Sequence, residues 1–337
     1  LGLCHLFAAG FITLAATRTD YNSLYTLVLL SVMFYMPTIA LSNSVAYNAL
    51  EKAGLDTVTH FPPIRVWGTV GFICAMWVVD LGKMGLSATQ LYFSATLGLI
   101  LGLYSFTLPN CPINRSGGGK SIVDLLGLRA FALFKQRKMA IFFIFSMLLG
   151  MSLQITNAFA DGYIKSFGDT GIHGAKYLGT FGVEHSTILI SLSQISETLC
   201  ILLIPFFLKR FGIKRVMLIA MFAWVLRFAL LGAGNPGPGV WMFILSMIVY
   251  GVAFDFFNIS GSLFVEKETS AAIRSSAQGV FMIMTNGLGA LIGSYLAGWI
   301  VNHYGWPLSW YLFAGFSLVV AIVFAVIFKY KHDPNRI

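Results

Sequence analysis

The sequence has 337 residues, of which 57% are hydrophobic and only 10% are charged. An ordinary soluble domain carries about 25% charged residues, so this composition excludes a water-soluble fold. The net charge of +9 fits the basic cytoplasmic loops of a membrane protein. No basic helix with interleaved exposed aromatic residues accompanies it, so we expect no nucleic-acid partner.

Ten apolar stretches are long enough to cross a bilayer, since a membrane helix needs roughly 20 residues. No alternating pattern typical of a β-barrel recurs, and lipid otherwise leaves only helices to satisfy the backbone. We therefore predict an all-α polytopic membrane protein in contact with lipid. The predicted spans lie near residues 2–17, 24–46, 64–81, 88–108, 139–160, 186–208, 216–233, 240–263, 277–301 and 309–329.

The basic residues predict the orientation, because cytoplasmic loops hold the excess of Lys and Arg. If the tail KYKHDPNRI lies in the cytoplasm, most of the Lys and Arg residues fall on the cytoplasmic side of the membrane. We therefore predict a cytoplasmic carboxyl terminus. The exceptions are four outside, Arg18, Lys83, Lys165 and Lys176, and one within a span, Arg227.

The chain begins at Leu1 directly with an apolar stretch, which indicates a chain cut at its amino end. A basic segment, residues 110–138, separates four predicted spans from six. Many transporters consist of two six-helix halves. By that pattern, the chain would contain ten of twelve helices. We expect residues 1–109 to be the remainder of the amino-terminal bundle, 110–138 a central cytoplasmic loop with an interfacial helix in DLLGLRAFALF, and 139–337 the carboxyl-terminal bundle and tail.

Two short patterns in the second half predict structure rather than chemistry. The basic run RFGIKR, residues 210–215, indicates a tight turn between two spans, and Gly289 and Gly293 have the spacing that lets helices approach closely. The cysteines form no pair at metal-ligand spacing, so we expect packing residues and no metal site. They are Cys4, Cys74, Cys111 and Cys200.

Polar groups inside apolar spans are the first candidates for function, because they are costly there and usually face a partner or a cavity. In FPPIRVWGTVGF, the helical spacing puts Arg65, Thr69 and Phe72 on one stripe. The alternative for Arg65 is an interfacial side chain that reaches the cytoplasmic surface.

Two further spans carry amides and a carboxyl. In SLQITNAF, Gln154 and Asn157 share a face, and their amides suit a neutral, hydrogen-bonding solute, unless they only join neighbouring helices. In SLSQISETL, Gln194 and Glu197 lie one turn apart, with Glu197 about halfway along its span. A carboxyl there can act in a proton relay, or form a structural ion pair with an arginine, Arg227 or Arg65.

The segment IVYGVAFDFFNISGS combines rings with a carboxyl. Tyr250 and Phe254 share a helix face, Asp255 is adjacent, and Asn258 follows one turn later. Aromatic faces can stack on a flat polar ring, although core packing is the commoner reason for such rings.

The strings FPPIRVWGTVGF, LFKQRKMAIFFIFSMLLG, LQITNAF, IVYGVAFDFFNISGSLFVEKE and IRSSAQGVFMIMTNGLG resemble the nucleoside:proton symporter family over essentially the whole chain. The resemblance implies a twelve-helix major facilitator fold in the bacterial inner membrane. It also implies uptake of purine and pyrimidine nucleosides by alternating access, driven by protons. The loop 165–185 differs from familiar members, so external gating or substrate preference can differ.

The family's nucleoside-contact pattern falls on residues that the polar faces already mark, with Asp255 as an additional functional acid. We expect the amides and Glu197 to bind base edges and ribose hydroxyls, the rings to enclose the nucleobase, and Asp255 or Glu197 to carry the proton. The substrate-contact positions are Arg65, Thr69, Phe72, Gln154, Asn157, Gln194, Glu197, Tyr250 and Phe254.

Three other functions stay open from the sequence. A related transporter could carry a sugar, since fold alone does not decide cargo, and a receptor could bind without transport. An intramembrane enzyme would need a nucleophile with its base or a metal cluster at membrane depth, and neither pattern is found, so we expect no enzyme and no cofactor. We expect a monomer.

Overall fold

The computed structural model describes residues 1–55, 57–85, 87–108, 128–173, 175–269 and 273–330. Within these ranges the chain is helical, with turns and no strand. It divides into two compact units, Leu1–Gly117 and Gly118–Ile337.

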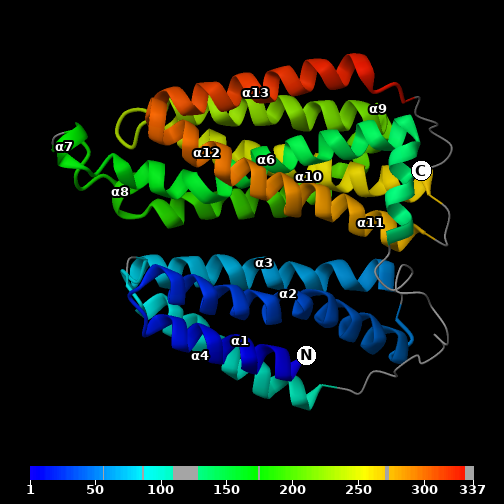
Figure 1. Cartoon of the computed structure of the whole chain (residues 1–337), viewed down its shortest axis with the longest axis horizontal. Helices are drawn as coiled ribbons and strands as arrows, with labels where there is room; N and C mark the ends of the chain where they lie inside the picture. Colours follow the sequence, from blue (N-terminus) through cyan, green and yellow to red (C-terminus); the bar gives the residue numbers. More distant parts are fainter. Residues whose placement is uncertain (56, 86, 109–127, 174, 270–272, 331–337) are drawn as a thin grey trace. The chain divides into compact units, whose positions relative to one another are not determined.

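The described residues of the first unit form four long helices (Figure 1). Helix α1 lies against both α2 and α4. The ring of Phe34 in α2 is 5.2 Å from that of Phe7 in α1, and a Cβ added to Gly98 in α4 would lie 3.3 Å from the Cβ of Ala9. Small side chains therefore allow α4 to approach α1 closely. The elements are α1 (Gly2–Ala16), α2 (Tyr21–Lys52), α3 (Thr57–Leu81), α4 (Thr89–Tyr104) and the short 3₁₀ turn η1 (Ser105–Thr107).

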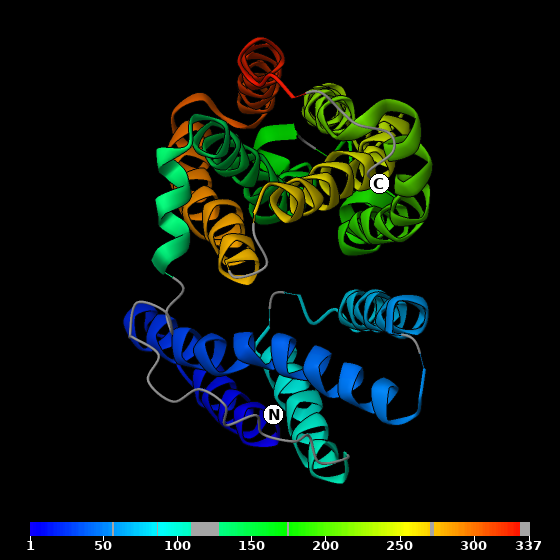
Figure 2. The same ribbon diagram turned by 90° about the vertical axis from the view of Figure 1, so that its right-hand side faces the viewer.

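The second unit is a bundle of long helices around an aromatic core, and Figure 2 shows these helices closer to end-on. Phe142 packs on Phe264 and Phe281, with ring centroids 4.6 and 5.4 Å away. Nearer the other end, Tyr163 packs on Trp310 at 5.3 Å. The elements are η2 (Leu128–Lys135), α6 (Arg137–Ser166), α7 (Thr170–His173), α8 (Phe181–Glu184), α9 (Ser186–Ala233), α10 (Val240–Glu268), α11 (Arg274–Met282), the π-helical η3 (Ile283–Gly289), α12 (Ala290–Tyr304) and α13 (Trp306–Ile327).

All ten predicted stretches coincide with helices, but fewer qualify as membrane spans by length and apolarity. In the described part of the chain, six do. Helix α9 contains two of the predicted spans, which Gly212 separates with a positive φ of 76° in the predicted basic turn. The apolar helix Gly2–Ala16 is shorter. The count of ten spans out of twelve therefore stays a prediction.

Most of the predicted central loop, residues 110–127, lies outside the described residues, as does the tail from residue 331. The described remainder begins as a 3₁₀ helix, η2, in which Ala130 and Leu133 are buried. Where α6 begins, Lys138 pairs with Glu268 at the end of α10 at 2.6 Å.

Glycines join the penultimate predicted span to α6, as the spacing of Gly289 and Gly293 predicts. A Cβ on Gly289 would lie 2.5 Å from the carbonyl oxygen of Met147, and one on Gly293 would lie 2.7 Å from the Cα of Met151. On the α6 side, a Cβ on Gly150 would collide with the carbonyl of Thr285 in η3. The close approach of η3 and α12 to α6 therefore depends on glycine at these three positions.

Candidate functional site

In the first unit, the predicted stripe lies on α3. Phe72 is 54% exposed and Thr69 is half-buried. Arg65 belongs to the same helix, but its side chain lies outside the described residues. The stripe on α3 therefore stays a predicted contact surface.

In the second unit, the first half of α9 approaches α10 most closely at Ser196. The Ser196 hydroxyl donates a hydrogen bond to the carbonyl of Ile248. A Cβ on Gly251 would lie 2.6 Å from the backbone carbonyl atoms of Ser196. The absence of a side chain at Gly251 brings the next residue of α9, Glu197, to the polar face of α10.

Two carboxyl groups from different helices meet at this junction. Glu197 of α9 is close enough to interact electrostatically with both Tyr250 and Asp255 of α10. Asp255 is 3% exposed, and its Oδ2 has no hydrogen-bond partner among the described residues. A buried carboxyl oxygen with an open acceptor site, next to a second acid, is a suitable place for a transported proton.

Aromatic rings lie beside the acids. Tyr250 and Phe254 stack with centroids 5.8 Å apart and planes 17° apart. Trp224 of α9 meets the Tyr250 ring edge-on at 6.1 Å. The two rings that the sequence predicts on one helix face therefore form a stacked pair. Phe254 is the half-buried member of this pair.

Of the predicted amides, Asn157 is the one that reaches this cluster. It is close enough to hydrogen-bond the Tyr250 side chain and is itself exposed. Gln154, one turn earlier on α6, and Gln194, one turn before Glu197, are half-buried. Within the described residues, neither glutamine side chain makes a hydrogen bond to another helix, which leaves both amides open to a solute.

Arg227, in the second half of α9, is almost completely buried, with 1% exposure. Its guanidinium carbon lies 4.6 Å from the centroid of the Tyr250 ring, and it donates hydrogen bonds to the Ser246 carbonyl at 2.5 Å and the Thr156 hydroxyl at 3.4 Å. Among the described residues it has no carboxylate within salt-bridge distance. The ion pair with Glu197 that the sequence left open is therefore wrong for Arg227, which instead makes a cation–π contact with the Tyr250 ring.

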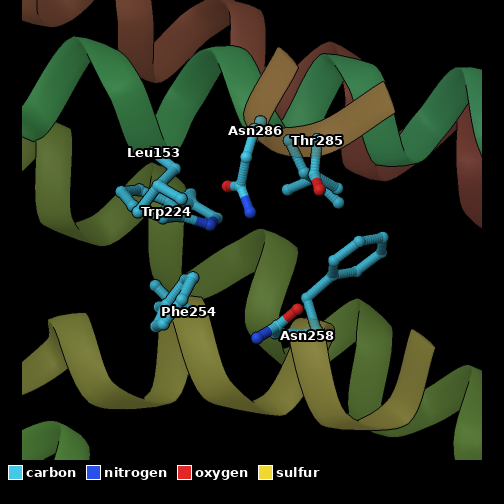
Figure 3. A pocket seen from close by; sticks show the side chains of 10 residues that line it. Leu153, Trp224, Phe254, Asn258, Thr285 and Asn286 are labelled. Atoms are coloured by element: carbon cyan, nitrogen blue, oxygen red, sulfur yellow. The ribbon is translucent and has the colours of Figure 1, made fainter. Parts of the chain in front are cut away.

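A small cavity of about 20 Å³ adjoins Phe254, between α6, α9, α10 and η3. Figure 3 shows Asn286 of η3 and Asn258 of α10 on opposite walls, with Trp224 reaching in from the side. Asn258 also lines a larger cavity of about 380 Å³ beside it. The sequence analysis did not single out Asn286 or Trp224 for function; an amide in an otherwise apolar span was the available signal for Asn286.

No described group of three or more His, Cys, Asp and Glu residues is arranged to hold a metal ion. What the second unit does offer is two acids, two stacked rings and several amides on three packed helices. This set can bind a neutral, flat, hydrogen-bonding solute and a proton.

Comparison with known proteins adds an independent finding. A family model described as "Nucleoside H+ symporter" matches residues 1–333. The chain is 51% identical to the nucleoside permease NupG of Escherichia coli K12, over 98% of this chain and 80% of that protein. It is 50% identical to the xanthosine permease of the same organism, over 99% of this chain and 81% of that protein.

Solved structures agree with the sequence relatives. A crystal structure of the nucleoside transporter NupG matches with a TM-score of 0.87 at 51% identity, covering 98% of this chain and 82% of the other. A crystal structure of an NupG mutant matches with a TM-score of 0.92 at 50% identity, covering 97% of this chain and 82% of the other.

Proposed function

Because the chain belongs to the nucleoside H+ symporter family, we propose that it takes up purine and pyrimidine nucleosides together with protons by alternating access. It is a multi-pass membrane transporter and not an enzyme. Its place is the bacterial inner membrane, with the carboxyl terminus in the cytoplasm, as the distribution of Lys and Arg predicts.

The observation that carries this proposal is the junction of α9 and α10, where Glu197 and Asp255 lie beside the stacked rings of Tyr250 and Phe254. Stacking on an aromatic ring contributes about 1 to 3 kcal/mol per nucleic-acid base. The same interaction would hold a free nucleobase against Phe254, the half-buried ring of the pair, with the buried ring of Tyr250 behind it.

Hydrogen-bonding groups then orient the nucleoside. Gln154, Asn157, Gln194 and Glu197 would bind base edges and ribose hydroxyls, since amides both donate and accept. The first unit, as the remainder of the amino-terminal bundle, would add the stripe on α3, in which Phe72 contributes a further ring and Arg65 and Thr69 contribute donors.

The proton is assigned to the pair of Glu197 and Asp255. A neutral nucleoside cannot draw on the membrane potential unless a titratable group carries charge with it. A proton bound to either acid removes the repulsion between two carboxylates, of which that of Asp255 is buried. Asp255, with its buried and unpartnered oxygen, is the stronger candidate.

Radiolabelled uridine uptake by the full-length protein tests the proposal, in cells that lack their own nucleoside carriers. We expect accumulation that collapses with a protonophore. Asp255→Asn should abolish accumulation while uridine still exchanges across the membrane, because exchange needs no net proton movement. Glu184→Gln, which removes an exposed carboxyl in α8, is the matched control and should accumulate uridine normally.

The competing functions give different results in the same cells. Excess free sugar that competes with the uptake, while nucleosides do not, would indicate another cargo. Uridine binding without any accumulation, despite normal amounts of protein in the membrane, would indicate a receptor.

A further inference from the structure

The small cavity between Asn258 and Asn286 has the size of one polar group. Its volume of about 20 Å³ exceeds the roughly 10 to 15 Å³ needed to hold one water molecule. A hydroxyl therefore fits between the two amides. The cavity is open on one side and Asn258 also lines the larger cavity beside it, so a substituent of a larger molecule can reach this space from outside.

The polar groups on its walls are open. Within the described residues, neither amide has an oxygen or nitrogen partner, and the contact of Asn286 Nδ2 with the sulfur of Met282 at 3.8 Å is weak. The Thr285 hydroxyl is already used, since it donates to the Phe281 carbonyl at 2.9 Å. Most of the remaining wall is apolar, from residues such as Leu149 and Phe257. Asn286 is exposed and Asn258 is half-buried, so both amides are accessible, and their unused donors and acceptors can bind a ligand group in the space between them.

The backbone holds Asn286 in this position. It belongs to the π-helical turn η3, a rare conformation that is frequent at functional sites. The turn is held close to α6 by Gly150 and Gly289, where any side chain would collide with the opposite backbone. Figure 3 shows the Asn286 amide pointing from this turn into the cavity, opposite Asn258.

The cavity lies next to the proposed nucleobase site. Phe254 forms part of its wall and is also the partner of Tyr250 in the stacked pair. A nucleoside whose base packs on this pair would have its attached ribose within reach of the neighbouring cavity.

We propose that Asn258 and Asn286 form a subsite for one ribose hydroxyl and make the transporter specific for nucleosides that carry it. The hydroxyl is the substituent that fits, because it donates and accepts at once between two amides on opposite walls; a base carbonyl only accepts and an exocyclic amine mainly donates. This inference rests on the proposed nucleoside transport at the same site.

The test measures how well 2′-deoxyuridine, 3′-deoxyuridine and 5′-deoxyuridine inhibit uptake of labelled uridine, each relative to unlabelled uridine. In the wild type, we expect one of the three to bind about 10-fold or more weakly, since it leaves the amides without their partner. In Asn258→Ala and Asn286→Ala, uridine itself should weaken, and the ratio for that one analogue should fall towards one. The ratios for the other two should stay unchanged.

Asn302→Ala is the matched control, because Asn302 is an exposed asparagine near the end of α12, outside the cavity. It should preserve all three wild-type ratios. Where an alanine variant does not reach the membrane, Asn258→Ser and Asn286→Ser replace it, with the same ratio expected to decrease.

Three equal ratios near one in the wild type would overturn the subsite, since the cavity would then hold only water. Wild-type discrimination that persists unchanged in the variants would also overturn it. Both outcomes still require uridine uptake, and they are therefore distinct from failure of the proposed function, in which the wild type accumulates no uridine.

Discussion

Adding one methyl group at Gly251 tests the junction on which the candidate site depends. The new Cβ of Gly251→Ala would lie 2.6 Å from the carbonyl carbon and oxygen of Ser196 and 2.7 Å from its Oγ. Favourable contact between carbon atoms begins near 3.5 Å, so α9 and α10 must separate by about 0.9 Å. Two of the three contacts are backbone atoms, and a change of side-chain rotamer cannot relieve them.

The expected cost has a structural and a functional part. Overpacking of this kind costs about 1 to 3 kcal/mol, and each kcal/mol lowers the Tm by about 2 to 4 °C for a unit of this size. The same displacement moves Glu197 away from Tyr250 and Asp255. Because a misplacement of about 1 Å can cost up to 100-fold in rate, we expect uridine uptake to fall about 10-fold or more.

The assay combines thermal unfolding of the detergent-solubilised protein with uridine uptake corrected for the amount of protein in the membrane. Gly315→Ala is the control, since this glycine lies within α13 with open space around its Cβ position. It should leave uptake and Tm unchanged or raise the Tm slightly, because alanine favours the helix over glycine. A Gly251→Ala protein with wild-type Tm and uptake would refute the close approach of α9 and α10.

Three further perturbations have defined outcomes. Phe254→Ala removes the accessible ring of the stacked pair and should raise the KM for uridine about 5- to 150-fold, corresponding to about 1 to 3 kcal/mol of lost stacking. Phe254→Tyr keeps the ring and should change KM far less; equal effects would contradict a stacking role. Arg227→Met removes the charged donor to a buried backbone carbonyl, and an unpaired buried carbonyl costs about 1 to 3 kcal/mol, so the Tm should fall. The KM for uridine should rise, because Tyr250 loses its contact with the guanidinium. Arg227→Lys should be intermediate in both measurements. At the start of α2, hydrogen bonds from the Ser23 side chain and, second, from the Ser23 N–H at 2.8 Å lower the pKa of the Asp20 carboxyl. Their stabilisation should therefore be present at neutral pH and disappear as the pH falls through the lowered pKa, so that the Tm difference between wild type and Asp20→Ala closes on acidification.

The helices and their polar stripes could be predicted from the sequence because they depend on local order along the chain. The length of each apolar run determines whether a helix can cross lipid, and residues three or four apart share a helix face in any helix. The spans around residues 139–160 and 240–263 and the stacked pair of Tyr250 and Phe254 follow from these two regularities. So does the turn at Gly212 between two spans.

Which faces meet depends on packing between helices that are distant in sequence, and no local pattern contains that information. The sequence marked Glu197 and Asp255 separately, but only the contact of Ser196 with Gly251 brings these acids together. It also offered Arg227 as a partner for Glu197, whereas the folded chain gives the guanidinium to the Tyr250 ring and a backbone carbonyl.

Asn286 shows the same division between local pattern and tertiary structure. The apolar, glycine-rich sequence around Asn286 determined that this segment is a helix packed closely on a neighbour. The sequence did not determine the direction in which the Asn286 side chain points. The π-helical turn that points its amide at Asn258 was decided by the tertiary structure. The physical reason is that the backbone contacts at Gly150 and Gly289 are made by α6, more than a hundred residues earlier in the chain.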